Sequence, residues 1–192
     1  MTTIFFYGHT PDKFKEDKFR HVFSQWYVDN KGFNEGESVH DLSNVVVNPP
    51  LLEKLDNKFT TREQYMMFNK ALLFAKEENT QINLQIAEEI MKSDPRRCKA
   101  LGRKIKGFDP KIWDAYKYKI VVNGNYLQFS QNIVMKKILL ETGNKEIVEA
   151  SPFDNIWGIG LTETRAQIEP RSKWGENLLG KAIMEVRDLL RK

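Results

Sequence analysis

The sequence predicts a mainly α-helical protein with a few short strands, folded as one compact domain over residues 1–192. Three observations support this class. Apolar residues recur at three- and four-residue spacing in several stretches, which is the spacing of a buried helical stripe. Capping side chains followed by proline mark helix starts at Ser93-Asp94-Pro95 and at Asp109-Pro110. A chain of 192 residues, 41% of them hydrophobic, is long enough to bury one sizeable core.

Aromatic residues and turn formers dominate the first 60 residues, where we expect short strands and loops with a firm break at Asn48-Pro49-Pro50. The stripes and caps that follow predict helices and one short strand. The first helix is capped by Thr60 or Thr61, and three more follow over 82–92, near 95–105 with its end at Gly107, and near 110–120. A long helix marked by Phe129, Ile133 and Leu140 then stops at Thr142-Gly143. A strand over 147–150 and a final helix from about Asn177 complete the chain's predicted elements.

Charge and cysteine content exclude several classes of protein. The net charge of +4 is mild and its basic residues form no polybasic tail, so it does not predict a general nucleic-acid coat, although it suits an anionic ligand such as a phosphate. Cys98 is the only cysteine, so no intramolecular disulfide can form, and we expect it to be a buried packing residue. No apolar run is long enough to span a membrane and no signal peptide is evident, so we expect a cytoplasmic protein without a membrane partner.

Common metal and nucleotide motifs are missing. His9, His21 and His40 are the only histidines, and none has a cysteine or carboxylate at metal-ligand spacing. The sequence also lacks the glycine patterns of dinucleotide folds and phosphate-binding loops and the serine elbow of hydrolases. We therefore predict no metal site and no cofactor.

Residues 150–160 bring Asp154 and Trp157 together in a segment rich in turn formers. Glycine, aspartate and asparagine favour turns that bond their own backbone, which predicts a rigid loop. Two interpretations remain open: a loop that holds ligand contacts, and a structural turn with Trp157 packed into the core.

Glu63 and Lys70 lie seven residues apart in the helix predicted from Thr61, so both project from nearly the same face. They could share the wall of a cleft, or they could be a first-turn glutamate and a solvated lysine. The adjacent Met66 and Met67 are expected to fill the core.

Arg103 follows Gly102 inside a predicted helix, where glycine costs about 1 kcal/mol relative to alanine. The glycine indicates close packing or approach of a ligand, whereas a surface ion pair is the alternative role for the arginine. Trp113 is a core residue by default, and its ring could also stack on a nucleobase.

Seven motifs in this order resemble the NADAR family, also called YbiA-like, from about Phe5 to Leu190. They are Phe6-Tyr7-Gly8, Thr61-Arg62-Glu63-Gln64-Tyr65 with Lys70-Ala71, Leu101-Gly102-Arg103 with Phe108-Asp109 and Trp113, Gln131-Asn132, Leu140-Glu141-Thr142-Gly143, the run from Glu149 to Gly160, and Trp174 to Gly180 with Met184-Glu185-Val186-Arg187. The family usually has Ser-Asn-Phe near Ser24-Gln25-Trp26, and the spacer from Gly160 to Trp174 is longer than in its shortest members.

The resemblance implies a compact YbiA-like helical fold and an N-glycosidase, a hydrolase that cleaves N-glycosidic bonds to ribose. ADP-ribose on guanine bases of nucleic acid is the substrate we expect, and the resemblance also allows an associated ADP-ribosyltransferase as a partner. Ribosylaminopyrimidine intermediates of riboflavin synthesis are an alternative substrate, and a non-catalytic module that binds ADP-ribose is an alternative function.

The resemblance also assigns roles to residues. Glu63 and Asp154 are the expected catalytic carboxylates, and Lys70 could instead attack the ribose carbon to form a Schiff base. The expected substrate-binding residues are Tyr7, Gly8, Arg103, Trp113, Trp157, Gly158, Gly160 and Asn177.

Overall fold

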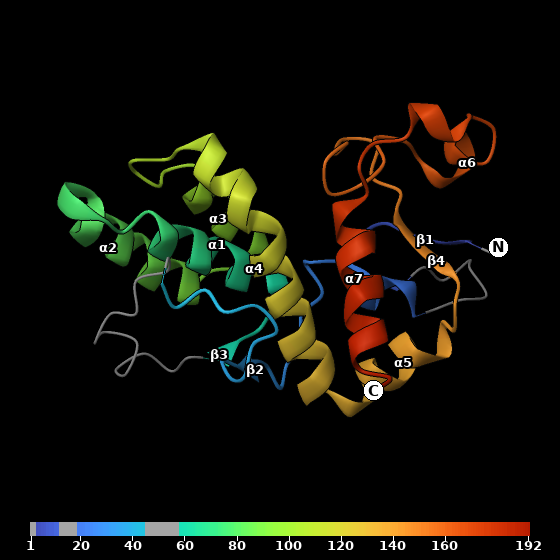
Figure 1. Ribbon diagram of the computed structural model, residues 1–192, viewed down its shortest axis with the longest axis horizontal. Coiled ribbons are helices and arrows are strands. Elements are labelled where there is room, and N and C mark those ends of the chain that lie inside the picture. The colour runs from blue at the N-terminus through green and yellow to red at the C-terminus, as the bar shows by residue number, and fades with distance from the viewer. Residues whose placement is uncertain (1–2, 12–18, 45–57) are drawn as a thin grey trace. The chain divides into compact units, whose positions relative to one another are not determined.

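The computed structural model describes residues 3–11, 19–44 and 58–192, so the predicted break at Asn48-Pro49-Pro50 lies outside the described residues. The described residues form seven α-helices and four short strands (Figure 1), which confirms the predicted mainly α class. They divide into two compact units, one of residues 1–27 with 129–192 and one of residues 28–128. A single domain over 1–192 stays a prediction.

The first unit is built on a pair of parallel strands. Strand β1 pairs with β4 in the register Ile4 opposite Ile147 and Phe6 opposite Glu149. The elements of this unit are β1 (Thr3–Phe6), a 3-10 turn (Arg20–Phe23), α5 (Ile133–Glu141), β4 (Glu146–Glu149), α6 (Glu163–Ala166), a second 3-10 turn (Arg171–Lys173) and α7 (Leu178–Leu189). The predicted strand near 147–150 and the predicted final helix are therefore confirmed.

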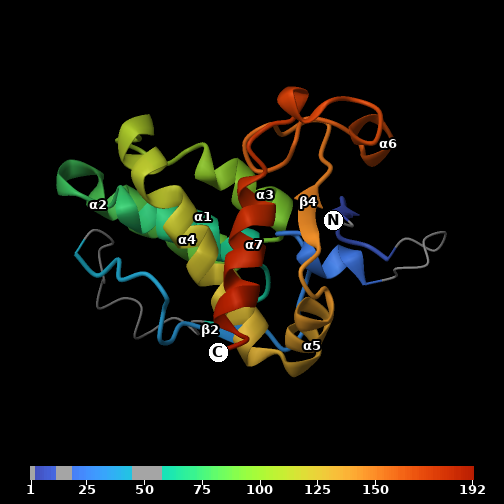
Figure 2. The ribbon, with the colours of Figure 1, turned by 45° about the vertical axis from the view of Figure 1, so that its right-hand side comes forward.

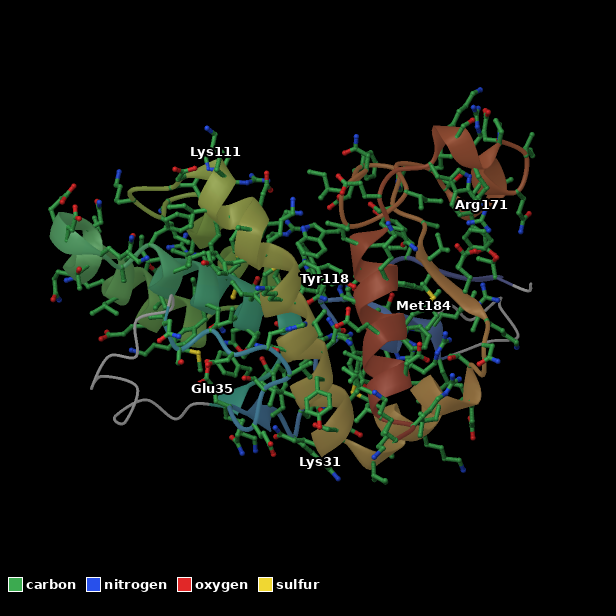
Figure 3. All side chains as sticks on the ribbon, viewed as in Figure 1. Lys31, Glu35, Lys111, Tyr118, Arg171 and Met184 are labelled. Carbon is green, nitrogen blue, oxygen red and sulfur yellow. The ribbon has the colours of Figure 1, made fainter. Side chains whose placement is uncertain are left out.

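Helix α7 packs against β4 and closes the core of this unit. Its buried stripe contains Leu179, Ile183 and Val186. Gly180 lies so close to the strand that a Cβ atom there would clash with the backbone oxygen of Ile147. Figures 1 and 2 both show α7 alongside β4, and Figure 3 shows Met184 on the side of the helix that faces the strand.

The second unit is a group of helices around α1. Its elements are β2 (Phe33–Asn34), β3 (Lys58–Phe59), α1 (Arg62–Leu73), a 3-10 turn (Glu77–Asn79), α2 (Thr80–Met91), α3 (Pro95–Gly102) and α4 (Pro110–Gln131), whose last three residues belong to the first unit. Strands β2 and β3 are antiparallel, and α1 packs against both α2 and α3.

Helix α1 is buried on nearly every side, because all of its residues except Lys70 are buried. The Thr61 side chain accepts a hydrogen bond from the backbone N–H of Gln64, which confirms Thr61 as the cap. Met66 and Met67 fill the core as predicted. A helix surrounded by other elements holds its polar side chains away from water, so Glu63 on α1 is a buried carboxylate.

Two helix boundaries differ from the prediction. Helix α4 continues to Gln131 instead of ending near 120. It passes through Gly124, where a Cβ atom would lie 2.6 Å from the Tyr65 ring, so glycine permits close packing there. Phe129 consequently belongs to α4. The next helix starts afresh because the Asn132 side chain accepts hydrogen bonds from the N–H groups of Val134 and Met135. Helix α3 ends at Gly102, before the turn at Gly107.

Within the described parts of the chain, no helix is long and apolar enough to cross a membrane. The cytoplasmic location stays a prediction. Cys98 is fully buried, as expected.

Candidate functional site

Tyr7 and Gly8 follow directly after β1, at the edge where the chain also leaves β4. The N–H of Ala150 donates to the backbone oxygen of Phe6 over 2.8 Å, which extends the parallel pairing by one step. Because parallel strands end at the same edge, Tyr7 and the segment after Ala150 emerge together. Tyr7 is 58% exposed, and Gly8 adopts a positive φ of 81°, which turns the chain away from the strand.

Asp154 holds the turn of the loop that follows β4. Its Oδ1 accepts hydrogen bonds from the backbone N–H of Ile156 at 2.9 Å and of Trp157 at 2.8 Å. Its own backbone oxygen accepts from the N–H of Gly160 at 2.9 Å. An aspartate that bonds the amides two and three residues ahead stabilises a turn, so the rigid loop predicted from the sequence is confirmed.

The loop is tied by backbone hydrogen bonds to the start of α7. The N–H groups of residues 175–179 donate to the backbone oxygens of Ile159, Asn155, Gly158, Ile156 and Trp157, in that order. A Cβ atom at Gly158 would lie 2.8 Å from the backbone oxygen of Glu149, and one at Gly175 would clash with Asn155. Glycine is required at both positions because two backbone segments pass there in direct contact.

Asn177 fastens this loop to β4. Its Oδ1 accepts from the N–H of Glu149 and its Nδ2 donates to the backbone oxygen of Ile147, each at 3.0 Å. The residue is 7% exposed and has a positive φ of 52°, a conformation that asparagine tolerates. Both functions of the side-chain amide are therefore engaged within the protein.

A cavity of about 460 Å³ opens beside Tyr7 in this unit. It is lined by Phe6, Tyr7, Ala150, Pro152, Thr162, Glu163, Thr164 and Gln167. Glu163 is held by Arg20, whose Nη1 lies 3.3 Å from the carboxylate and also donates to the backbone oxygen of Phe5. Figure 2 shows α6, which bears Glu163, beyond the end of β4 at which the loop begins.

Glu63 occupies the first turn of α1 in the second unit and is only 4% exposed. Arg62, next to it, is also buried and donates to Oδ1 of Asn125 at 2.9 Å. Burial raises the pKa of the Cys98 thiol to about 12, and the negative charge of Glu63 contributes to this rise. The same charge acts on Lys70, where it raises the pKa of the amine against the effect of burial. A buried carboxylate that acts on neighbouring groups is typical of a functional site.

Lys70 lies partly buried among aromatic rings at the other end of α1. Its Nζ donates to the backbone oxygen of Gly102 at 3.1 Å and lies 4.3 Å from the ring centroid of Phe108 and 5.1 Å from that of Trp113. Burial lowers the pKa of Lys70, and the negative charge of Glu63 opposes that shift. A lysine of lowered pKa has a larger fraction of neutral, nucleophilic amine.

Gly102 allows α3 to pack closely on α1, because a Cβ atom there would clash with the sulfur of Met67. This close packing is one of the two explanations that the sequence left open. The close packing brings the backbone oxygen of Gly102 within hydrogen-bond distance of the Lys70 amine. The Arg103 side chain, in contrast, is exposed at the end of α3. Trp113 is half-buried and its ring lies beneath the Lys70 amine. This partial burial is compatible with both roles considered for it, packing in the core and stacking on a base.

The structure thus groups the predicted residues into two sets. Those of the first unit are Tyr7, Gly8, Asp154, Trp157, Gly158, Gly160 and Asn177; those of the second are Glu63, Lys70, Arg103 and Trp113. The roles of both sets stay predictions. Sequence analysis named Phe108 only as part of a motif and overlooked Glu163, although an aromatic before Asp109-Pro110 and a glutamate after the capping Thr162 were available as signals.

Comparison with known proteins gives consistent matches along the chain. Residues 5–191 match the model of the NADAR domain. An N-glycosidase of Acanthamoeba polyphaga mimivirus is 42% identical over 188 residues, 96% of this chain and 94% of the relative, and protein irg-1 of Caenorhabditis elegans is 36% identical over 173 residues, 88% and 75%. The NMR structure of the Escherichia coli protein YbiA is similar with a TM-score of 0.63 and 22% identity, covering 99% of this chain and 85% of YbiA, and shares the fold. The chain belongs to the NADAR family.

Proposed function

We propose that this protein is an N-glycosidase that removes ADP-ribose from guanine bases of nucleic acid. The activity class is supported by the family and by the mimiviral relative that is named an N-glycosidase. The observation that carries the proposal is that one helix bears both the buried carboxylate Glu63 and Lys70, whose pKa burial lowers and Glu63 influences. Ionisable groups with perturbed environments are typical of functional sites and suit the chemistry of glycosidic bond cleavage.

Hydrolysis develops positive charge on the anomeric carbon of ribose. The bond from this carbon to the base nitrogen breaks, and its electron pair moves to the nitrogen. A fixed carboxylate stabilises the charge or takes a proton from the attacking water, which adds hydroxyl to the sugar while the base gains a proton. We assign this role to Glu63, because its side chain is held out of bulk water.

Lys70 offers a second route. A neutral amine can attack the same ribose carbon while the base leaves with the electron pair of the glycosidic bond and gains a proton. The bond from this carbon to the ring oxygen then opens to give a Schiff base, which water hydrolyses to free the sugar and the amine. Burial among Phe108 and Trp113 favours the neutral form of Lys70. We rank Glu63 above Lys70 as the essential group, and the two routes differ in whether the sugar becomes attached to the protein.

The remaining predicted residues receive binding roles under this proposal. Trp113 and Trp157 stack on the base or on the adenine of ADP-ribose, Arg103 neutralises phosphate and exposed Tyr7 contacts the substrate. Gly8, Gly158 and Gly160 allow close approach of the backbone. Asn177 acts through the loop it holds, because both of its polar side-chain atoms bond backbone groups. Asp154 holds the loop through Oδ1, and Asp154→Asn tests the catalytic role predicted for its carboxylate.

The test is release of free ADP-ribose from an oligonucleotide that carries ADP-ribosyl guanine. Wild type is compared with Glu63→Gln and Asp154→Asn, and a ribosylaminouracil phosphate is supplied in parallel. Release that depends on Glu63 supports the proposal. Cleavage of the aminouracil compound alone would show that the substrate is a riboflavin precursor and not ADP-ribosyl guanine. Tight ADP-ribose binding without cleavage would show that the protein is a binding module. Borohydride trapping of a sugar on Lys70 distinguishes the Schiff-base route from direct attack by water.

A further inference from the structure

Basic residues are concentrated in one stretch of the second unit. Residues 92–119 contain 10 lysines and arginines against 3 acidic residues, a net charge of +7, whereas the rest of the chain contains 20 against 23, a net charge of −3. The mild net charge of +4 therefore conceals a strong asymmetry. A local excess of this size attracts a polyanion even when the charge of the whole protein is small.

Most of these cations are exposed and available for an external partner. Arg97 pairs with Glu89, and Lys117 pairs with Asp114 at 2.6 Å. The other eight have no carboxylate within 4.0 Å among the residues that the structure describes, and all eight are exposed. They are Lys92, Arg96, Lys99, Arg103, Lys104, Lys106, Lys111 and Lys119.

The cations follow one another along α3 and the turn that leads into α4. Arg96, Lys99 and Arg103 are three and four residues apart, so they line one face with neighbouring Cβ atoms about 5–6 Å apart. Lys104 and Lys106 continue this row past the end of α3. Lys111 lies in the first turn of α4, and Figure 3 shows it projecting away from the ribbon there.

Aromatic side chains lie among these cations. Phe108 is 45% exposed between Lys106 and Lys111 in the sequence, and Trp113 follows in α4. Exposed rings beside basic residues are the combination that proteins use to bind unpaired bases, because a ring stacks on a base while the cations contact phosphates. Phe108 also contacts the Lys70 amine, so this surface adjoins the partly buried lysine of α1.

We propose that the basic surface formed by Arg96, Lys99, Lys104, Lys106, Lys111 and Phe108 binds single-stranded nucleic acid. The cations contact successive phosphates and Phe108 stacks on an unpaired base. Single strands fit better than duplex, since stacking on Phe108 and chemistry on a base both require a base outside the helical stack. The inference implies that the substrate is a polymer and not a free nucleotide, and this implication rests on the proposed function.

The first test measures binding of an unmodified 16-nucleotide single strand, as DNA and as RNA, between about 50 and 200 mM salt. Contacts with about four phosphates give a log–log slope near −3 for single strands, which weakens wild-type binding about 60-fold over this range. The variant R96Q/K99Q/K104Q/K106Q/K111Q should bind about tenfold or more weakly at low salt and show a much flatter slope. Binding of either nucleic acid supports the inference.

A matched control removes the same charge from exposed positions elsewhere. The variant K31Q/K76Q/K145Q/K181Q/K192Q changes five exposed lysines that lie outside residues 92–119. It should retain the affinity and the slope of wild type. If both variants lose affinity equally, or neither does, the basic surface has no specific role and the inference is overturned.

Two further arms separate this inference from its competitors. The five-site variant should cleave a free ADP-ribosylated guanosine monophosphate as wild type does and lose kcat/KM only on oligonucleotide. If no protein cleaves either substrate but the variant alone loses binding, the proposed function fails and the surface assignment stands. Equal affinity for a duplex would overturn the preference for single strands. Tighter binding to phosphatidylserine vesicles than to oligonucleotides would overturn the assignment to nucleic acid.

Discussion

The two units hold their candidate residues in different ways. In the first unit, Asp154 and Asn177 place their polar atoms on backbone groups and thereby shape a loop. In the second, Glu63 is buried and Lys70 partly buried, and burial lowers the pKa of the amine. The comparison teaches that residues of equally specific motifs differ in hydrogen-bond partners and burial. On this basis we propose that Glu63 and Lys70 react and that Asp154 and Asn177 hold the loop.

Glu63→Gln should have the largest effect on activity. A carboxylate that stabilises charge or takes a proton contributes roughly 10²–10⁴-fold to the rate, so we expect kcat for ADP-ribose release to fall about 10³-fold. The melting temperature should change little, because the amide has nearly the same shape. Single-turnover release assays measure the rate, with Glu78→Gln, an exposed glutamate of the same unit, as the control. A wild-type rate in Glu63→Gln would remove the contrast between the two units.

Gly180→Ala should have the largest effect on stability. The new methyl group would clash with the backbone oxygen of Ile147 and lie 2.5 Å from Nδ2 of Asn177, so it would disturb the fastening of α7 to β4. Overpacking of this kind costs about 3 kcal/mol of unfolding free energy. Gly36→Ala is the matched control, since its methyl group would lie 3.7 Å from Leu127, an ordinary contact. Urea unfolding that gives equal stabilities for both variants would show that the first unit is less rigid than its contacts indicate.

Asp154→Ala should weaken the loop without abolishing chemistry. The substitution removes the acceptor of two backbone N–H groups in the turn, and leaving such groups without a partner costs about 1–3 kcal/mol. Asp154→Asn keeps an oxygen at Oδ1 and should lose much less stability. Because the role is one of positioning, KM should rise more in Asp154→Ala than kcat falls. A large fall of kcat in Asp154→Asn at wild-type stability would instead make Asp154 a reactive carboxylate like Glu63.

The smallest expected effect is the pH dependence of stability that Lys70 contributes. Burial lowers its pKa in the folded chain below the value of about 10.4 for an exposed lysine. Between these two values the unfolded chain binds more protons, so this group makes stability rise with pH through that window. Lys70→Met should remove the contribution, as measured by urea unfolding at several pH values in that alkaline window.

Cys98 contributes to the pH dependence of stability in the opposite direction to Lys70. Its pKa is raised by burial to about 12, so above the ordinary thiol pKa the unfolded chain loses its proton first and stability falls with pH. This contribution is shared by wild type and Lys70→Met, and it cancels in their difference. Identical pH profiles for the two proteins would contradict the lowered pKa of Lys70.

Local patterns were sufficient to predict many elements. The Thr61 and Asp94 caps depend on short-range hydrogen bonds. The strand before residue 150 and the helix after Asn177 could be predicted from the pattern of apolar residues, although the strand itself pairs with distant β1. The end of α4 was predicted wrongly: the helix continues through Gly124, a residue type that usually weakens a helix and that here packs against Tyr65. For Gly102, close packing was one of two explanations that the sequence left open, and its neighbour Met67 could not be named.

By itself the sequence determined the helical class, the motif order that marks the family and the concentration of positive charge in residues 92–119. These properties depend on residue types and on spacing along the chain. Only the tertiary structure decided that Asn177 bonds the backbone of β4, and that Phe108 and Trp113 surround the Lys70 amine. The reason is physical: burial, pKa and hydrogen-bond partners depend on side chains that distant segments bring together.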